Sequence, residues 1–143
     1  MAGVVERLRT IIHESGAPEQ TLVVVSRFIE RRALGAGDGV LRSTFQRLSR
    51  LGRESGTRAV YQRLAQTDLS VHVYGRDDWD VPETLAVETH TGYPWCVVFR
   101  PPADSDPHAA LLALETGSNE WVGTWTYDAG RVRRIERVLV EAF

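Results

Sequence analysis

The sequence has a single cysteine, Cys96, and no lysine among its 143 residues. One cysteine cannot form an internal disulfide, which favours a reducing compartment, and we expect the protein in the cytoplasm. No apolar run reaches the roughly 18 residues of a membrane span, and the amino terminus lacks the cationic head and apolar middle of a signal peptide. All 17 basic residues are arginine. We interpret this as a bias of the coding genome, because no single site would exclude lysine everywhere.

Motifs for nucleotide, covalent or metal chemistry are also missing. There is no Gly-x-Gly-x-x-Gly or Walker A sequence for phosphates, and no Gly-x-Ser-x-Gly elbow for a nucleophilic serine. The four histidines lie far apart without a companion cysteine, so the ligand spacing of a zinc site is lacking. Cys96 lies in an apolar run, where a thiol is usually inert packing. We therefore expect no metal site, no catalytic residue and no enzyme activity.

The composition is that of one globular domain. A hydrophobic fraction of 43% with 25% charged residues is too apolar for a disordered chain. The formal net charge of −2 gives no sign of the positively charged surface that binds nucleic acid or an anionic membrane. We expect neither as a partner.

Helical spacing appears at three places in the chain. Apolar residues between positions 4 and 12 share one face of an opening helix, which Gly16 and Pro18 end. A second helix begins near Thr57 and buries Tyr61 and Leu64. In the last helix apolar residues recur between positions 132 and 139, and Asp128 precedes them as the expected cap.

Strands are expected in six segments. The β-branched run at residues 22–25 is typical of a strand covered on both faces, and Ser26 would then cap a helix that continues to about Leu34. Residues 40–51 fit a helix or a strand, and we favour a strand leading into Phe45. Alternation or short apolar runs predict further strands at residues 69–74, 95–99, 109–114 and 121–127. Residues 76–82 form a polar surface loop.

Strands that alternate with helices predict a single α/β domain with a mainly parallel or mixed sheet of about five to six strands and helices on its faces. Residues 1–20 form an amino-terminal helix that belongs to the domain or packs on it, and residues 21–143 form the domain. In such sheets ligands bind in the crevice beyond the carboxyl ends of the strands. The candidate ligand-binding residues combine aromatic area with polar groups: Ser26, Phe45, Gln46, Arg50, Trp125, Tyr127 and Asp128. In the alternative interpretation Ser26 and Asp128 are only helix caps, and Trp121, Trp125 and Tyr127 belong to the core.

Several segments taken in order resemble the DICT sensory domain, which is named for its occurrence with diguanylate cyclases and two-component systems. The resemblance runs from about Thr21 to Leu139. It is carried by Leu-Val-Val-Val-Ser-Arg at 22–27 with Glu30, Phe-Gln-Arg at 45–47, Tyr61 with Leu-Ala at 64–65, and Trp-Thr-Tyr-Asp at 125–128. Arg27 stands where many relatives have histidine, so no role of that histidine carries over.

The resemblance implies a regulatory domain of bacterial or archaeal signal transduction, including signalling by cyclic di-GMP. Such a domain receives a signal, and residues 21–143 would be its sensory part. The partner is then a small molecule or a signalling protein, the ligand and any cofactor stay unidentified, and a homodimer is an open alternative. A protein-binding adaptor and a small hydrolase or transferase are the competing functions.

Overall fold

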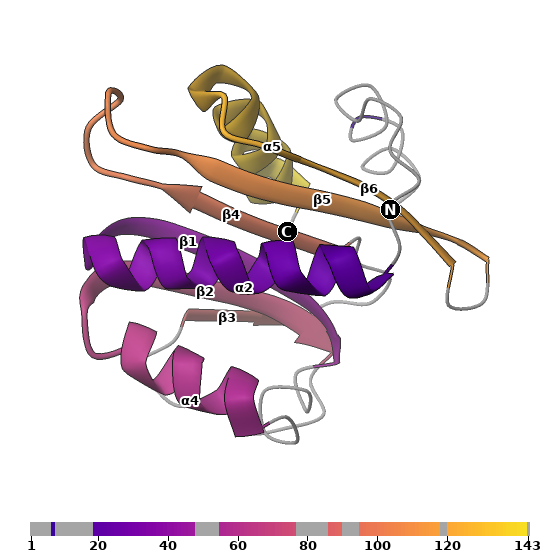
Figure 1. Cartoon of the computed structure of the whole chain (residues 1–143), viewed down its shortest axis with the longest axis horizontal. Helices are drawn as coiled ribbons and strands as arrows, with labels where there is room; N and C mark the ends of the chain where they lie inside the picture. The colour runs from indigo at the N-terminus through magenta and orange to yellow at the C-terminus, as the bar shows by residue number, and fades with distance from the viewer. Residues whose placement is uncertain are drawn as a thin grey trace.

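The computed structural model describes Arg7 and residues 19–47, 55–76, 86–89, 95–117 and 120–142 (Figure 1). Within these residues the chain forms three helices and six strands. In chain order they are α2 (Glu19–Ala36), β1 (Asp38–Arg47), α4 (Ser55–Leu64), β2 (Asp68–Arg76), β3 (Ala86–Thr89), β4 (Trp95–Arg100), β5 (Ala109–Gly117), β6 (Glu120–Thr126) and α5 (Ala129–Ala142). Arg7 is helical, and the rest of the predicted helix at 4–12 lies outside the described residues.

The six strands form one mixed sheet in the order β3-β2-β1-β4-β5-β6. β1, β2 and β3 are parallel, with α4 as the crossover between β1 and β2. β4, β5 and β6 continue the sheet with antiparallel pairs, β1 with β4, β4 with β5 and β5 with β6. The predicted α/β fold with a mixed sheet and helices on its faces is confirmed.

Helices α2 and α4 cover one face of this sheet (Figure 1). Leu22, Ile29 and Ala33 recur at helical spacing and are fully buried against the strands. Tyr61 and Leu64 of α4 join the same apolar cluster. Successive side chains of a strand point to opposite faces of the sheet, so every second side chain of a strand points toward α2 and α4.

Helix α5 covers the other face over β4 and β5. Its apolar residues Val132, Ile135 and Leu139 pack on Cys96 and Leu112 of the sheet. Because both faces of β4 and β5 are buried, these strands are almost continuously apolar. Such short apolar runs are the pattern that predicted strands at residues 95–99 and 109–114.

The predicted strand at residues 22–25 is wrong, because these residues lie inside α2. Only Leu22 of the run is fully buried, and Val24 is 68% exposed, so the run has one helical face toward the sheet and one toward solvent. Packing of Leu22 and Ile29 on the sheet outweighs the weak strand preference of the valines. Ser26 consequently lies in the middle of a helix and cannot act as its amino-terminal cap.

The remaining predicted elements agree with the structure. The strand into Phe45, the helix near Thr57 and the strands at 69–74, 95–99, 109–114 and 121–127 correspond to β1, α4, β2, β4, β5 and β6, with Tyr127 just beyond the end of β6. Arg76 ends β2, and residues 77–82 of the expected loop lie outside the described residues. Within the part of the chain that the structure describes, no helix is both long and apolar enough to cross a membrane.

Two glycines fix the junction between α2 and β1. Gly37 ends the helix with a φ of 69°, a left-handed conformation that favours glycine, and its N–H donates to the carbonyl of Ala33. Gly39 has a φ of 108°, and a Cβ there would lie 2.5 Å from the carbonyl oxygen of Arg100. The junction thus holds the carboxyl end of α2 close to the loop that follows β4.

Candidate functional site

A pocket of about 340 Å³ lies between the carboxyl-terminal half of α2 and the loop that joins β4 to β5. Its walls combine apolar side chains with three charged ones: Arg32, Ala36, Asp38, Phe99, Pro101, Pro102, Asp106 and Pro107. The volume is at the lower end of the range typical of small-molecule sites, which is about 300–1,000 Å³. The pocket is therefore sized for a small metabolite.

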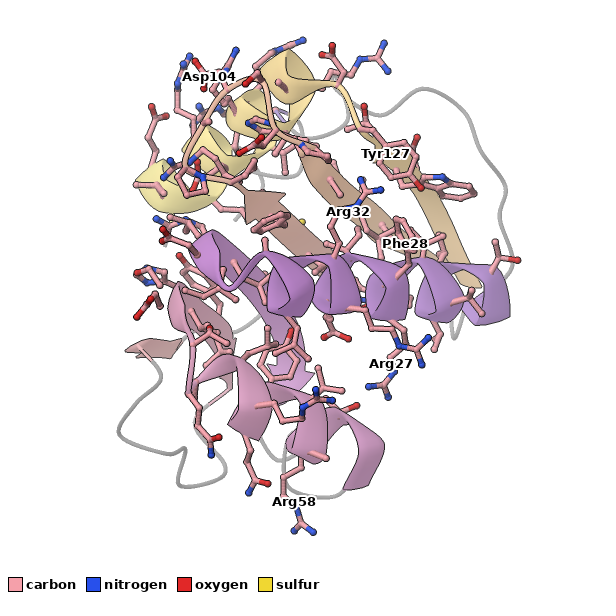
Figure 2. All side chains as sticks on the ribbon, turned by 60° about the vertical axis from the view of Figure 1, so that its left-hand side comes forward. Arg27, Phe28, Arg32, Arg58, Asp104 and Tyr127 are labelled. Carbon is pink, nitrogen blue, oxygen red and sulfur yellow. The ribbon has the colours of Figure 1, made fainter. Side chains whose placement is uncertain are left out.

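Arg32 is the cation of this pocket, and two aromatic rings hold its guanidinium (Figure 2). The guanidinium carbon lies 4.7 Å from the ring centroid of Phe28 and 5.3 Å from that of Tyr127. The two rings meet edge to face, with centroids 6.1 Å apart. No carboxylate forms an ion pair with Arg32 in the part of the chain that the structure describes. Its charge is positioned by these cation–π contacts.

Two carboxylates face the same pocket. Asp38 follows the end of α2 and accepts a hydrogen bond of 2.7 Å from the backbone N–H of Gly39. Asp106 belongs to the loop before β5. Among the described residues, a ligand in the pocket would therefore meet one cation, two anions and apolar walls made of three prolines and Phe99.

His108 holds the loop that carries Asp106. Its side chain is buried, and its Nδ1 lies 2.8 Å from the carbonyl oxygen of Asp106. Because a carbonyl oxygen only accepts, Nδ1 is the donor in this hydrogen bond. The other ring nitrogen, Nε2, is buried, and no residue in the described part of the chain forms a hydrogen bond with it. The contact fixes the position of Asp106 and Pro107 at the edge of the pocket.

A buried polar network joins the opposite flank of α2 to α4 and β1. Arg27 donates a hydrogen bond of 2.7 Å to Thr57, and Tyr61 donates one of 2.5 Å to Ser43. Glu30, only 3% exposed, lies beside this network 3.9 Å from Arg27. Burial raises the pKa of Tyr61 well above its usual value, and the charge of Glu30 adds to the effect. The network brings together Arg27, Glu30 and Tyr61, three of the residues that carry the DICT resemblance.

A second charged cluster attaches α5 to the sheet. Glu136 accepts hydrogen bonds from Arg42 of β1 at 3.0 Å and from Arg100 of β4 at 2.6 Å. Arg42 also donates to the hydroxyl of Tyr74 at 2.7 Å. These partners satisfy the mostly buried Glu136, and we assign the cluster a structural role.

The structure separates the site residues expected from the sequence. Ser26 is half-buried in the middle of α2. Phe45 and Gln46 lie near the carboxyl end of β1, where the register against β2 shifts, and Arg50 lies outside the described residues. Trp125 is three strands away from β1 along the sheet order, a distance of about 14 Å at the usual strand spacing.

Among the described candidates, Trp125, Tyr127 and Asp128 come together at the end of β6, away from Phe45 and Gln46. Asp128 caps α5 through a hydrogen bond of 2.9 Å from the N–H of Arg131, as predicted. Tyr127 contacts the cation of the pocket, and Trp125 is 37% exposed beside it on the edge strand. Trp125 and Tyr127 are therefore surface groups, in contrast to the interpretation that placed them in the core.

The sequence interpretation missed Phe28 and Arg32. Their spacing of i, i+4 places them on one helical face, which would have been a readable signal if residues 22–25 had been assigned to the helix. The contribution of Pro101, Pro102 and Pro107 depends on the β4–β5 loop folding against α2. The residues that make this contact are far apart in the sequence, so no local sequence pattern indicates it.

Comparisons with known proteins identify a family and a fold. The family described as "Sensory domain in DIguanylate Cyclases and Two-component system" (DICT) matches residues 4–125. This match begins before residue 21 and ends within β6, so the segment at 126–128 that supported the resemblance lies beyond it. No curated protein matches the sequence.

One solved structure has a similar fold, the crystal structure of polyphosphate kinase from Porphyromonas gingivalis. Its TM-score is 0.52 at 16% identity, over 81% of this chain. The similarity covers 22% of that protein, so this chain corresponds to about a fifth of it. At this identity the similarity concerns the fold alone.

Proposed function

Because the chain belongs to the DICT family of sensory domains, we propose that it receives its signal as a small molecule in the pocket beside Arg32. The sensory role in signal transduction follows from the family. The observation that supports the pocket is the guanidinium of Arg32, held by two rings and unpaired with any described carboxylate. A cation positioned in this way favours an anionic ligand group.

The two carboxylates narrow the class of ligand. A molecule with several negative groups would meet Arg32 but would be repelled by Asp38 and Asp106. A small zwitterion with one carboxylate or phosphate, one amino group and an apolar body matches the charges on both sides. We propose that the ligand has this amino-acid-like chemistry.

The same charges disfavour a cyclic dinucleotide in this pocket. Such a ligand carries two phosphates, whereas the described pocket residues include one cation and two anions. The family description associates the domain with diguanylate cyclases. We propose that this domain acts as an input to such bacterial or archaeal signalling proteins in the cytoplasm.

Transmission of the signal would use α2 and the β4–β5 loop. The loop leads into β5, while α2 contacts β1, β4, β5, β6 and α4. A ligand bridging Arg32 and Asp106 would join these two elements, and a shift of α2 would reach the whole sheet. The buried network of Arg27 and Tyr61 would carry the shift to α4.

A protein-binding adaptor is the second candidate function, because exposed apolar side chains gather on α2 and at the end of β6. The hydrolase or transferase alternative has less support. Burial raises the pKa of the Cys96 thiol, which disfavours the thiolate that nucleophilic catalysis needs.

Calorimetry and thermal-shift measurements with a defined panel test the proposal. The panel contains amino acids and their phosphorylated analogues, simple carboxylates, nucleotides and cyclic di-GMP. A zwitterion should stabilise the protein by about 2.7 kcal/mol at a hundredfold excess over its Kd. The Arg32→Gln variant should lose this stabilisation.

Arg31 provides the matched control, because it lies exposed on the same helix and is not part of the pocket. Arg31→Gln should bind as tightly as the wild type. A ligand that binds equally well to the Arg32→Gln variant would place the signal site elsewhere. Binding of cyclic di-GMP that depends on Arg32 would contradict the proposed ligand class.

A further inference from the structure

Exposed apolar side chains are concentrated on one surface of the protein. The described residues include six exposed large hydrophobic side chains. Five of them lie on α2 and at the end of β6, and one of these five is Val23 (41% exposed). We call the other four the α2–β6 surface: Val24 (68% exposed), Phe28 (42%), Trp125 (37%) and Tyr127 (52%). Val24 and Phe28 share a helical face at i, i+4, and Phe28 contacts Tyr127. Clustered exposed apolar groups of this kind mark interaction sites.

The α2–β6 surface borders an edge of the sheet. Among the described strands, β6 pairs only with β5, so the backbone groups on its outer side face no other described strand. An exposed edge is a template for pairing with another strand, and proteins usually protect it with charged residues, with proline or by making it short.

The two edges of this sheet differ in that protection. β3, at one edge, has four residues. β6, at the other, has seven, contains neither proline nor a basic residue, and carries its only charge at Glu120, its first position. With respect to the described strands the longer edge is therefore open to pairing, and it is the edge that lies beside the exposed aromatic residues.

We infer that the occupant of this edge is a second copy of the chain, whose β6 pairs antiparallel with the first. A partner for this site must offer a strand edge and, beside it, apolar area for Val24 and Trp125. A second copy supplies both when a twofold axis passes between the β6 strands perpendicular to the sheet. The net charge of −2 causes little repulsion between copies.

This arrangement has a geometric consequence. The sheet continues across the axis from six strands in one copy to six in the other, and both α2 helices lie on the same face. Phe28 and Tyr127 then border the dimer contact and also hold Arg32. The inference goes beyond the proposed function, because the dimer forms whether or not a ligand occupies the pocket.

Sedimentation velocity of the full chain, at concentrations up to about 1 mM, tests the dimer. A Kd of 1 mM corresponds to only about −4.1 kcal/mol, so even a weak dimer is detected. We expect twice the monomer mass for the wild type. Val24→Glu and Trp125→Thr should shift the protein to monomer with at least a tenfold weaker Kd.

Val140 is the matched control, because it is 50% exposed on α5 and lies outside the α2–β6 surface. Val140→Glu should leave the dimer intact. Thermal melts of the Val24→Glu and Val140→Glu variants show whether each remains folded. A wild-type monomer at every concentration, or a dimer that dissociates only with Val140→Glu, overturns the inference.

Spin labels test the antiparallel pairing. Cys96 is fully buried and escapes labelling, so single cysteines placed at Glu120, Thr124 and Thr126 report on β6 alone. Antiparallel strands related by a twofold axis give interspin distances that pass through a minimum along β6. Parallel strands would give a constant distance, and an interface elsewhere would give long distances at all three positions. Either result contradicts the inferred dimer.

Discussion

Replacing Tyr61 by phenylalanine tests the buried network between α2, α4 and β1. Tyr61 is 2% exposed, and its hydroxyl donates a hydrogen bond to the hydroxyl oxygen of Ser43, which is fully buried. Tyr61→Phe keeps the ring and leaves the Ser43 hydroxyl without this donor. A buried polar group that loses its partner costs about 1–3 kcal/mol, and we expect the free energy of unfolding to fall by that amount.

Urea unfolding of four proteins separates the hydrogen bond from other effects. These are the wild type, Tyr61→Phe, Ser43→Ala and the double variant. Removing both partners is less costly than leaving one unpaired, so the double variant should lose less than the sum of the single losses. Losses that add within about 0.3 kcal/mol would refute the coupling of Tyr61 to Ser43.

The raised pKa of Tyr61 adds a pH dependence with a definite sign. Burial and the nearby Glu30 keep the phenol protonated in the folded state, while the unfolded phenol loses its proton near pH 10. Above that pH the folded state binds more protons than the unfolded state, so stability falls as pH rises. The stability of Tyr61→Phe should fall less steeply than that of the wild type above pH 10. An identical slope in both proteins would contradict the assignment.

Three further predictions concern other parts of the fold. Asp128→Ala removes the side chain that accepts from the N–H of Arg131 and should cost about 1 kcal/mol in chemical unfolding; an unchanged midpoint refutes the cap. Gly123→Ala places a Cβ 2.7 Å from Leu22 Cδ2 and should cost roughly 1–3 kcal/mol, whereas a gain in melting temperature would show that α2 packs differently. The Cys96 thiol should react with a thiol reagent only when the protein opens, because it is fully buried; rapid labelling of the native protein would contradict this burial.

The sequence indicated most of the sheet because its strands have regular burial patterns. Residues 95–99 and 109–114 are apolar throughout, and the structure covers them with α2 on one face and α5 on the other. Asp128 was readable as a cap because capping depends on residues within one helical turn. These features depend on local chemistry or on a simple period.

The error at residues 22–25 has a specific cause. Three consecutive valines favour a strand, but no glycine, proline or asparagine separates Val25 from the following helical residues. A strand that leads into a helix needs such a turn. The recurrence of Leu22, Ile29 and Ala33 at helical spacing was the stronger signal, because it extends over the whole of α2.

The pocket required contacts that no local pattern encodes. Arg32 and Pro107 are far apart in the sequence, and only the packing of α2 on the sheet brings them together. The expected crevice at the carboxyl end of β1 combined Gln46 with Trp125, which the sheet order separates by three strands. Topology therefore decides which of the predicted aromatic and polar residues can share a site.

Native mass spectrometry of the protein purified from its own host tests the central claim most directly. The account predicts a retained small zwitterion, seen as one added mass per chain in the wild type and in Arg31→Gln, and absent in Arg32→Gln. A retained molecule that persists in the Arg32→Gln variant, or a wild-type chain that carries no added mass and binds no member of the panel, would contradict the account.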